Sequence, residues 1–337
     1  MNENLNDAMK NIVTENEHIT SREVSQEPLF AHCIGLINDF DKKEIPQGEK
    51  LQFEGVDGYD VYNISAPFYI GDKVFVTGRV EKTEEIDDSQ VMLFEKKDGG
   101  WCLANEQPKF KMEDGFATHI GDELIIGGVE VYPDSTEENP NHKSYRTIFY
   151  RGKDTASLEQ FAVGPDTMKD IRLISLPNGK IGVFTRPQGE IGGKGKIGYM
   201  EIDSLDDLKK KDILNNAEII ENQFPEGEWG GANELHLLSD GRIGVIGHIA
   251  YQDEKGKHYY AMAFIYDPKT KSASPMEIIA TRKNFPNGKA KRPELDDIIF
   301  PGGLIRNGDG TAILYAGLGD AETGRITIKD PFEEIRL

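Results

Sequence analysis

The sequence predicts an all-β protein folded as a five-bladed β-propeller. Three observations support this fold class. An apolar strand, a glycine-containing turn and a second apolar strand follow one another five times along the chain. A further strand-like stretch follows each hairpin, and the unit recurs every roughly 50 to 70 residues, which is the pattern of propeller blades. A β-helix or a sandwich is the alternative, but a sandwich would not repeat so regularly.

The five hairpins can be followed in order by their turns, because Asn-Gly and Asp-Gly pairs supply the positive φ values that tight hairpins need. The turns fall at Gly71–Asp72, Gly121–Asp122, Asn178–Gly179, Asp240–Gly241 and Asn307–Gly310. The third strand of each unit follows from Val91, Arg146, Lys196, Tyr259 and Gly324. We therefore expect five radial sheets whose first strands surround one funnel.

Some segments lie outside the repeat. Residues 1–50 are predicted to form an N-terminal extension, and residues 51–337 the propeller. Within the extension, residues 1–25 look like a flexible or helical arm. Residues 51–63 are expected to enter the first blade, and the polar segment 203–220 to form a partly helical connection between blades.

Composition indicates a globular protein with an acidic surface. Of the 337 residues, 37% are hydrophobic and 29% charged, and the net charge is -20. A field of this sign repels phosphate backbones and anionic lipids, which argues against nucleic acid and membranes as partners.

No apolar run approaches the roughly 20 residues that span a bilayer. The polar, acidic start lacks the features of a secretory signal, so we expect a cytoplasmic protein. Cys33 and Cys102 stand far apart without metal-ligand spacing and are expected to be free thiols.

Equivalent positions in propeller blades converge on one axis, so the repeat register is also a functional argument. The positions seven or eight residues beyond the turns are Arg79, Gly128, Arg186, His248 and Gly317. Three of these five are cationic or can become so, and an arginine fork matches phosphate or carboxylate oxygens. The ring predicts an anion site. The alternative is that the arginines pair with surface carboxylates and that His248 is a core histidine.

Polar residues also recur at the other end of these hairpins. They are Asn63, Asp114, Asp170, Asn233 with Glu234, and Gly302 with Gly303. A carboxylate at the mouth of an apolar pocket can serve as a general acid, which makes Asp114 a candidate, although an Asp-Gly pair is also ordinary turn chemistry. Its neighbour Glu113 is expected on the opposite face of an extended strand.

A glycosidase that hydrolyses its substrate needs a second carboxylate. The candidates are Asp57, Asp60, Asp170, Asp296, Asp297 and Asp320, and the sequence does not choose among them. A phosphorylase avoids this requirement, because inorganic phosphate is already a nucleophile and needs only cationic positioning. The predicted basic ring therefore fits phosphorolysis better than hydrolysis.

Several segments resemble those of the five-bladed-propeller β-mannoside phosphorylases. They are MEDGFATHIGDELIIGGVEV, KDIRLISLPNGKIGVFTRP, ANELHLLSDGRIGVIGHIAY with YYAMAFIYD, and LYAGLGDAETGRITI. The resemblance spans residues 53–332. GVDGYDVYNISAPF and FPGGLI are similar to segments of a narrower group, the β-1,2-mannan phosphorylases with mannosyltransferase activity of trypanosomatids and related bacterial proteins.

The resemblance implies a role for each matching residue. Asp114 takes the place of the general acid. The implied phosphate ligands are Arg79, Arg186, His248, Tyr260 and His236, and the implied sugar ligands are Asp60, Asn63, Asp170 and Asp320. Two departures affect donor recognition more than the acid: Gly115–Phe116 replaces a Pro-Arg pair, and His236 stands where the phosphorylases carry lysine.

The resemblance and the predicted ring together indicate inverting phosphorolysis of β-1,2-mannosides, or the reverse synthesis, with release of α-mannose 1-phosphate. The expected partners are a β-mannoside and inorganic phosphate as co-substrate, with no metal or organic cofactor. One alternative is mannosyl transfer from a nucleotide-activated sugar, although no glycine-rich nucleotide fingerprint is present. Another is a noncatalytic carbohydrate-binding propeller.

Overall fold

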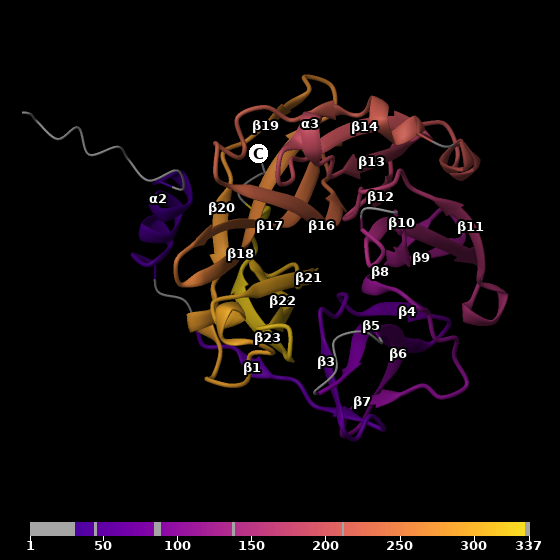
Figure 1. The fold of residues 1–337 in the computed structure, drawn as a ribbon, viewed down its shortest axis with the longest axis vertical. Helices are drawn as coiled ribbons and strands as arrows, with labels where there is room; N and C mark the ends of the chain where they lie inside the picture. The colour runs from indigo at the N-terminus through magenta and orange to yellow at the C-terminus, as the bar shows by residue number, and fades with distance from the viewer. Residues whose placement is uncertain (1–30, 44–45, 84–88, 137–138, 211, 334–337) are drawn as a thin grey trace, which may run out of the picture.

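Five antiparallel sheets surround a central axis in the computed structural model, so the protein is a five-bladed β-propeller, as the sequence predicts (Figure 1). The structure describes residues 31–43, 46–83, 89–136, 139–210 and 212–333. The innermost strands of neighbouring blades contact one another around the axis. The regular succession of radial sheets excludes the sandwich and the β-helix.

The first two blades follow the predicted order, and their strands pair antiparallel apart from a short parallel contact between β2 and β7. The strands of blade 1 are β2 (Phe53–Glu54), β3 (Tyr59–Tyr62), β4 (Phe68–Ile70), β5 (Lys73–Lys82), β6 (Gln90–Lys97) and β7 (Gly100–Leu103). The strands of blade 2 are β8 (Glu113–Ile120), β9 (Glu123–Pro133), β10 (Lys143–Gly152) and β11 (Glu159–Val163). Segment 51–63 enters blade 1, as expected.

Blades 3 and 4 repeat this plan with different lengths. The strands of blade 3 are β12 (Arg172–Ser175), β13 (Ile181–Thr185), β14 (Gly198–Ile202) and β15 (Glu218–Ile219). The strands of blade 4 are β16 (Trp229–Leu237), β17 (Ile243–Asp253), β18 (Gly256–Asp267), β19 (Ser272–Ala273) and β20 (Glu277–Ala280). β19 and β20 both pair with β18, so two short strands form the outer edge of blade 4.

The fifth blade is built from both ends of the described chain. It contains β21 (Ile299–Arg306), β22 (Thr311–Leu318), β23 (Glu322–Lys329) and, on its outer edge, β1 (Glu49–Lys50). β1 pairs antiparallel with β23, and Glu49 forms an ion pair with Arg325 at 2.7 Å. The domain boundary placed at residue 50 therefore falls one short strand too late, because residues 49–50 close the ring.

The five predicted turns join β4 to β5, β8 to β9, β12 to β13, β16 to β17 and β21 to β22, each time an inner strand to the next strand outward, which confirms the repeat register. Backbone φ is positive at Gly71, Gly121, Gly179 and Gly241, and again at Gly308 in the fifth turn. A side chain would strain this conformation, so the turn glycines fix where each hairpin reverses.

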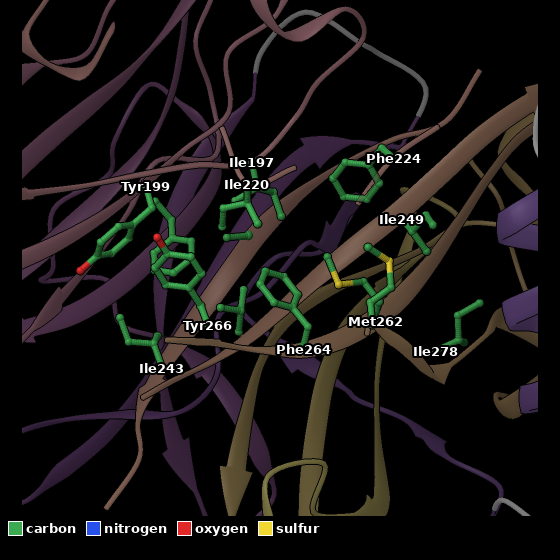
Figure 2. Packing of buried hydrophobic residues seen from close by; sticks show 14 of the residues in the cluster. Ile197, Tyr199, Ile220, Phe224, Ile243, Ile249, Met262, Phe264, Tyr266 and Ile278 are labelled. Carbon is green, nitrogen blue, oxygen red and sulfur yellow. The ribbon is translucent and has the colours of Figure 1, made fainter. Parts of the chain in front are cut away.

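The hydrophobic core lies mainly between neighbouring blades. Figure 2 shows one of its clusters, in which side chains of blade 3 pack against those of blade 4. Phe184 of β13 and Tyr266 of β18 meet edge to face with ring centroids 5.6 Å apart. Tyr199 of β14 lies 4.6 Å from the same Tyr266 ring. These aromatic contacts hold adjacent sheets at a fixed angle and so fix the funnel that the sheets enclose.

A helix from the N-terminal extension, α2 (Ala31–Phe40), packs on the outer side of blade 4 (Figure 1). Cys33 and Phe40 are buried in the cluster between blades 3 and 4. The carboxylate of Glu228 accepts the backbone N–H of Cys33 at 2.7 Å and contacts His32 Nδ1 at 2.9 Å. This contact satisfies a backbone donor that the first turn of a helix leaves free. The arm expected at residues 1–25 lies outside the described residues.

The remaining helices are short. The segment 203–220, expected to be partly helical, contains two 3-10 helices, and Ser204 and Asp207 form a capping box at the first. The short helices are α3 (Gly189–Gly192), η1 (Thr155–Ser157), η2 (Leu205–Lys209), η3 (Ile213–Asn216), η4 (Arg282–Asn284) and η5 (Pro293–Leu295). Within the described ranges, no helix has the length and apolarity needed to cross a membrane. Cys33 and Cys102 are both free thiols.

Candidate active site

Four of the predicted polar residues share an unusual backbone conformation. Asn63, Asp114, Asp170 and Asp320 have φ values of 46°, 49°, 57° and 52°, and they come from four different blades. Asn and Asp tolerate the left-handed region better than most residues, but it still costs energy. Such conformations concentrate at functional sites. Thr167, Asp212, Asn222 and Lys271 share the conformation, so it marks the four predicted residues as candidates without assigning them a role.

The predicted acid, Asp114, lies in a cluster formed by blades 1 and 2. Its Oδ1 accepts a hydrogen bond of 2.8 Å from Asn63 Nδ2 and one of 3.3 Å from Arg79 Nη1. Arg79 also reaches Glu113, with Nη2 to Oε1 at 3.0 Å. Arg79, a predicted phosphate ligand, therefore holds both carboxylates in this structure.

The expectation that Glu113 faces away from Asp114 is wrong. The pairing of β8 with β9 shifts between Glu113 and Phe116, where Asp114 and Gly115 form a bulge. A bulge and a left-handed residue both break the alternation of side chains along a strand. Glu113 and Asp114 consequently meet the same guanidinium.

Asp320 approaches this cluster from blade 5, whereas Asp60 lies nearer to Lys291. Burial, reinforced by the Asp114 charge, raises the pKa of the Asp320 carboxyl above its usual range. Burial likewise raises the pKa of Glu113, against the opposing charge of Arg79. Asp60 is buried on β3 and accepts a hydrogen bond of 3.2 Å from Thr83 Oγ1. This half of the site is rich in carboxyl groups, and burial raises the pKa of two of them, Glu113 and Asp320.

The second half of the site lies between blades 3 and 4. Arg186 and Asp170 form an ion pair of 3.1 Å whose two side chains are 3% and 2% exposed. Arg186 Nε also donates to the backbone oxygen of Gly230 at 2.7 Å. Burial opposes ionisation of Asp170, but the charges of Arg186 and Lys169 outweigh it and hold the pKa of this carboxyl below its usual range.

His248 joins this pair over Gly231. A Cβ atom at Gly231 would lie 2.8 Å from Arg186 Cδ, 2.9 Å from His248 Cε1 and 3.2 Å from Asp170 Oδ2. The three side chains therefore converge, as predicted for Arg186 and His248, and only glycine fits beneath them. Burial and the Arg186 charge lower the pKa of His248 to about 3, so the imidazole is neutral. Its Nδ1 lies 2.8 Å from Asn233 Oδ1.

Lys169, which the sequence argument missed, acts on both halves. Its charge opposes the rise in the pKa of Glu113 and Asp320 in the first half. In the second half it adds to the lowering of the pKa of Asp170 and His248. Lys169 precedes Asp170 and is not a repeat position, so the register could not select it. Its charge contributes to a net positive second half.

Two predicted phosphate ligands lie elsewhere. Tyr260 faces the other side of β18, where its hydroxyl donates to Asp297 Oδ2 at 2.5 Å. The neighbouring Tyr259 stacks on His248 instead, with ring centroids 5.5 Å apart. Adjacent residues of a strand point to opposite faces, so an error of one residue moves the side chain out of the site.

His236 also stands apart from the Arg186 group. It lies near the turn end of β16, whereas Gly231 lies near the other end of the same strand. Its Nε2 is 2.7 Å from Glu234 Oε2, and its ring packs beside Phe332. The structure does not bring His236 to the predicted anion site. Within the described ranges, no group of three or more His, Cys, Asp or Glu side chains is arranged to hold a metal ion.

Fold and site together define a five-bladed β-propeller with two linked charged clusters at its axis, one built around carboxyl groups and one around a buried arginine. Residues 38–334 match the model of a family described as "Protein of unknown function (DUF1861)", and the chain belongs to this family. No curated protein matches the sequence.

Several solved structures are similar to this chain in sequence and fold. The chain is similar to MPT-4, a mannose phosphorylase from Leishmania mexicana solved with a phosphate ion, at 36% identity and a TM-score of 0.82, over 90% of this chain and 94% of that one. It is equally similar to MPT-1, a GDP-Man-dependent mannosyltransferase from Leishmania mexicana, at 36% identity and a TM-score of 0.81, over 90% and 95% of the two chains. A structure from the GH130 family of mannoside phosphorylases, which is described as containing glycoside hydrolases that target β-1,2-mannosidic linkages, shares the fold at 10% identity and a TM-score of 0.56, over 86% of this chain and 97% of that one.

Proposed function

We propose that the protein catalyses the inverting phosphorolysis of β-1,2-mannosides and the reverse synthesis. The observation that carries the proposal is the convergence of Arg186, His248 and Asp170 over Gly231, beside Lys169 and around the same axis as Asp114. A buried arginine with a neutral imidazole and a nearby ammonium suits an oxyanion. The phosphate-bound mannose phosphorylase relative supports this reading of the site.

In the proposed reaction, a phosphate oxygen attacks the anomeric carbon of the terminal mannose. The glycosidic C–O bond breaks, its electron pair goes to the leaving oxygen, and Asp114 transfers its proton to that oxygen, directly or through a substrate hydroxyl. The products are α-mannose 1-phosphate and a mannoside shortened by one residue. Arg79 and Asn63 orient Asp114 through their hydrogen bonds to its Oδ1. A positioned acid contributes roughly 100- to 10,000-fold to such a step.

His248 has a definite role in this scheme. If its Nδ1 donates to Asn233 Oδ1, as the amide is oriented, its Nε2 is left as an acceptor. An acceptor suits the remaining hydroxyl of a singly protonated phosphate. Arg186 and Lys169 would then balance the phosphate charge, and the neutral imidazole would fix its orientation.

Three buried polar atoms provide further support for a polar ligand. Asp170 Oδ1, Asn63 Oδ1 and Asn233 Nδ2 have no hydrogen-bond partner within the described part of the chain. Buried polar atoms are almost always satisfied, so each of the three needs a partner, either a water molecule or a ligand. We assign them to substrate hydroxyls or phosphate oxygens, with Asp60 and Asp320 as further sugar ligands.

Mannosyl transfer from a nucleotide-activated sugar is the second candidate, because MPT-1 is as similar to this chain as MPT-4. One experiment separates the two. The protein is incubated with β-1,2-mannobiose and inorganic phosphate, and in parallel with GDP-mannose and a mannose acceptor. We expect mannose 1-phosphate only in the first reaction and only with phosphate present. Product from GDP-mannose alone would establish transfer instead, and mannoside binding without turnover in either reaction would establish a noncatalytic propeller.

A further inference from the structure

A buried carboxylate behind Arg79 joins the first and fifth blades. Glu81 on β5 is 1% exposed, and its Oε1 accepts from Arg79 Nε at 3.0 Å and from Arg79 Nη2 at 2.6 Å. Ser89 Oγ also donates to Oε1, and the Lys291 ammonium donates to Oε2. Glu81 therefore has two cations as partners, one from its own blade and one from 210 residues further along the chain.

Lys291 arrives from the connection between blades 4 and 5. Its backbone N–H donates to the Gly319 oxygen at 2.8 Å, beside Asp320. Its ammonium lies 5.4 Å from the centroid of the Tyr62 ring, and the guanidinium carbon of Arg79 lies 5.1 Å from the same centroid. The Lys291 side chain is only 8% exposed. Such burial distinguishes it from an ordinary surface lysine.

The contacts of Arg79 show why Lys291 matters for the acid. One guanidinium serves three carboxylates, Glu81, Glu113 and Asp114, and the contact to Asp114 is the longest at 3.3 Å. Without Lys291, Glu81 Oε2 would lose its cation while remaining buried, and an unpaired buried carboxylate is costly. The nearest remaining source of positive charge is Arg79. A shift of Arg79 toward Glu81 would first break its longest contact, the one to Asp114.

We propose that Lys291 and Glu81 form a positioning unit that holds Arg79 against Asp114, so that closure of the ring between blades 5 and 1 sets the geometry of the acid. This inference rests on the proposed role of Asp114. Neither Lys291 nor Glu81 is assigned a contact with the substrate. Their removal should therefore change kcat and leave phosphate recognition by the Arg186 group nearly unchanged.

The first test compares Lys291→Met, Lys291→Arg and the control Lys289→Met in phosphorolysis of β-1,2-mannobiose. Lys289 is exposed and lies two residues away in the same connection. We expect kcat of Lys291→Met to fall about 10- to 100-fold, as small misplacements of catalytic groups do. The KM for phosphate should stay within about threefold, because the variants leave the Arg186 group unaltered and an unchanged KM reflects unchanged binding. Lys291→Arg should recover most of the loss, and Lys289→Met should match the parent. An unchanged kcat, or a rise in phosphate KM alone, would overturn the proposal.

The second test does not depend on turnover. Crystal structures of the parent and of Lys291→Met should show the Arg79–Asp114 contact kept in the first and lost in the second. A contact retained in Lys291→Met refutes the positioning role, whatever the activity. If Lys291→Met fails to fold, the double variant Glu81→Gln/Lys291→Met removes both buried charges and should fold with kcat no lower than that of Glu81→Gln alone. A lower kcat in the double variant would overturn the proposed coupling of the two residues. Absence of mannose 1-phosphate from the parent would refute the proposed function, and the structures would still decide this inference.

Discussion

Replacing Arg186 with methionine should destabilise the propeller strongly as well as impair the anion site. Arg186 and Asp170 are almost fully buried, and Asp170 Oδ1 has no partner among the described residues. Methionine fills similar space but leaves the Asp170 charge unpaired. Breaking a buried pair by removing one partner typically costs about 3–5 kcal/mol.

The corresponding change in melting temperature can be worked out from chain length. Unfolding entropy is about 2.1 cal/mol/K per residue, so for 337 residues the loss corresponds to a fall in Tm of about 4–7 °C. Calorimetry or urea unfolding measures it. The exposed pair of Arg242 with Asp240, joined at 2.7 Å, is the matched control, and Arg242→Met should cost no more than about 1 kcal/mol.

The double variant Asp170→Asn/Arg186→Met tests the cause. Because it removes the unpaired charge together with its partner, it should recover most of the stability lost in Arg186→Met while remaining inactive. If Arg186→Met is as stable as the parent, or if the double variant is no more stable than the single one, the ion pair does not have the buried character described here. Phosphate binding, measured by calorimetry on the double variant, should be lost despite the recovered fold.

Three further predictions concern the acid and two groups with altered pKa. Asp114→Asn should fold but lose roughly 100- to 10,000-fold in mannose 1-phosphate release. Glu113→Gln should lose less activity. Equal activity of Asp114→Asn and the parent would remove Asp114 from the mechanism. The pKa of Asp320 is raised in the fold, so the folded protein holds this proton more tightly than the unfolded chain does. The free energy of unfolding therefore falls as the pH rises and Asp320 ionises. Asp320→Asn should therefore raise Tm more at pH 8 than at pH 5, and an equal gain at both would contradict the raised pKa. The pKa of His248 is about 3 in the fold against an ordinary 6.5, so below pH 6.5 only the unfolded chain gains this proton. Stability should fall toward pH 3 by at most about 1.4 kcal/mol per pH unit, and urea unfolding of His248→Gln should lack this contribution.

The sequence predicted the features of the fold that are local. Turn glycines and alternating apolar strands sit within a few residues of one another, and so the five hairpins and their third strands were placed in the right order. The closing strand β1 was missed because residues 49–50 are too short to carry a pattern, and their partner, β23, lies at the other end of the chain.

The same distinction applies to the site. The convergence of Arg186 with His248 and the contact of Asp114 with Arg79 could be anticipated because these residues occupy register positions of the repeat. Lys169 and Lys291 come from segments outside the repeat, whose course is set by tertiary contacts. Tyr260 was chosen where Tyr259 faces His248, since resemblance alone does not fix which face of a strand a residue occupies.

The two charged clusters also divide the work between Arg79 and Arg186, which the sequence treated as equivalent. Arg79 shares its donors among Glu81, Glu113 and Asp114, so an incoming phosphate would meet carboxylates there and be repelled. Arg186 faces the single carboxylate of Asp170, with Lys169 adding a further positive charge. In a chain of net charge -20, an anion can bind only where the local balance reverses the average field. The charge balance reverses around Arg186, which supports the proposal that phosphate binds at blades 3 and 4 while Arg79 orients Asp114.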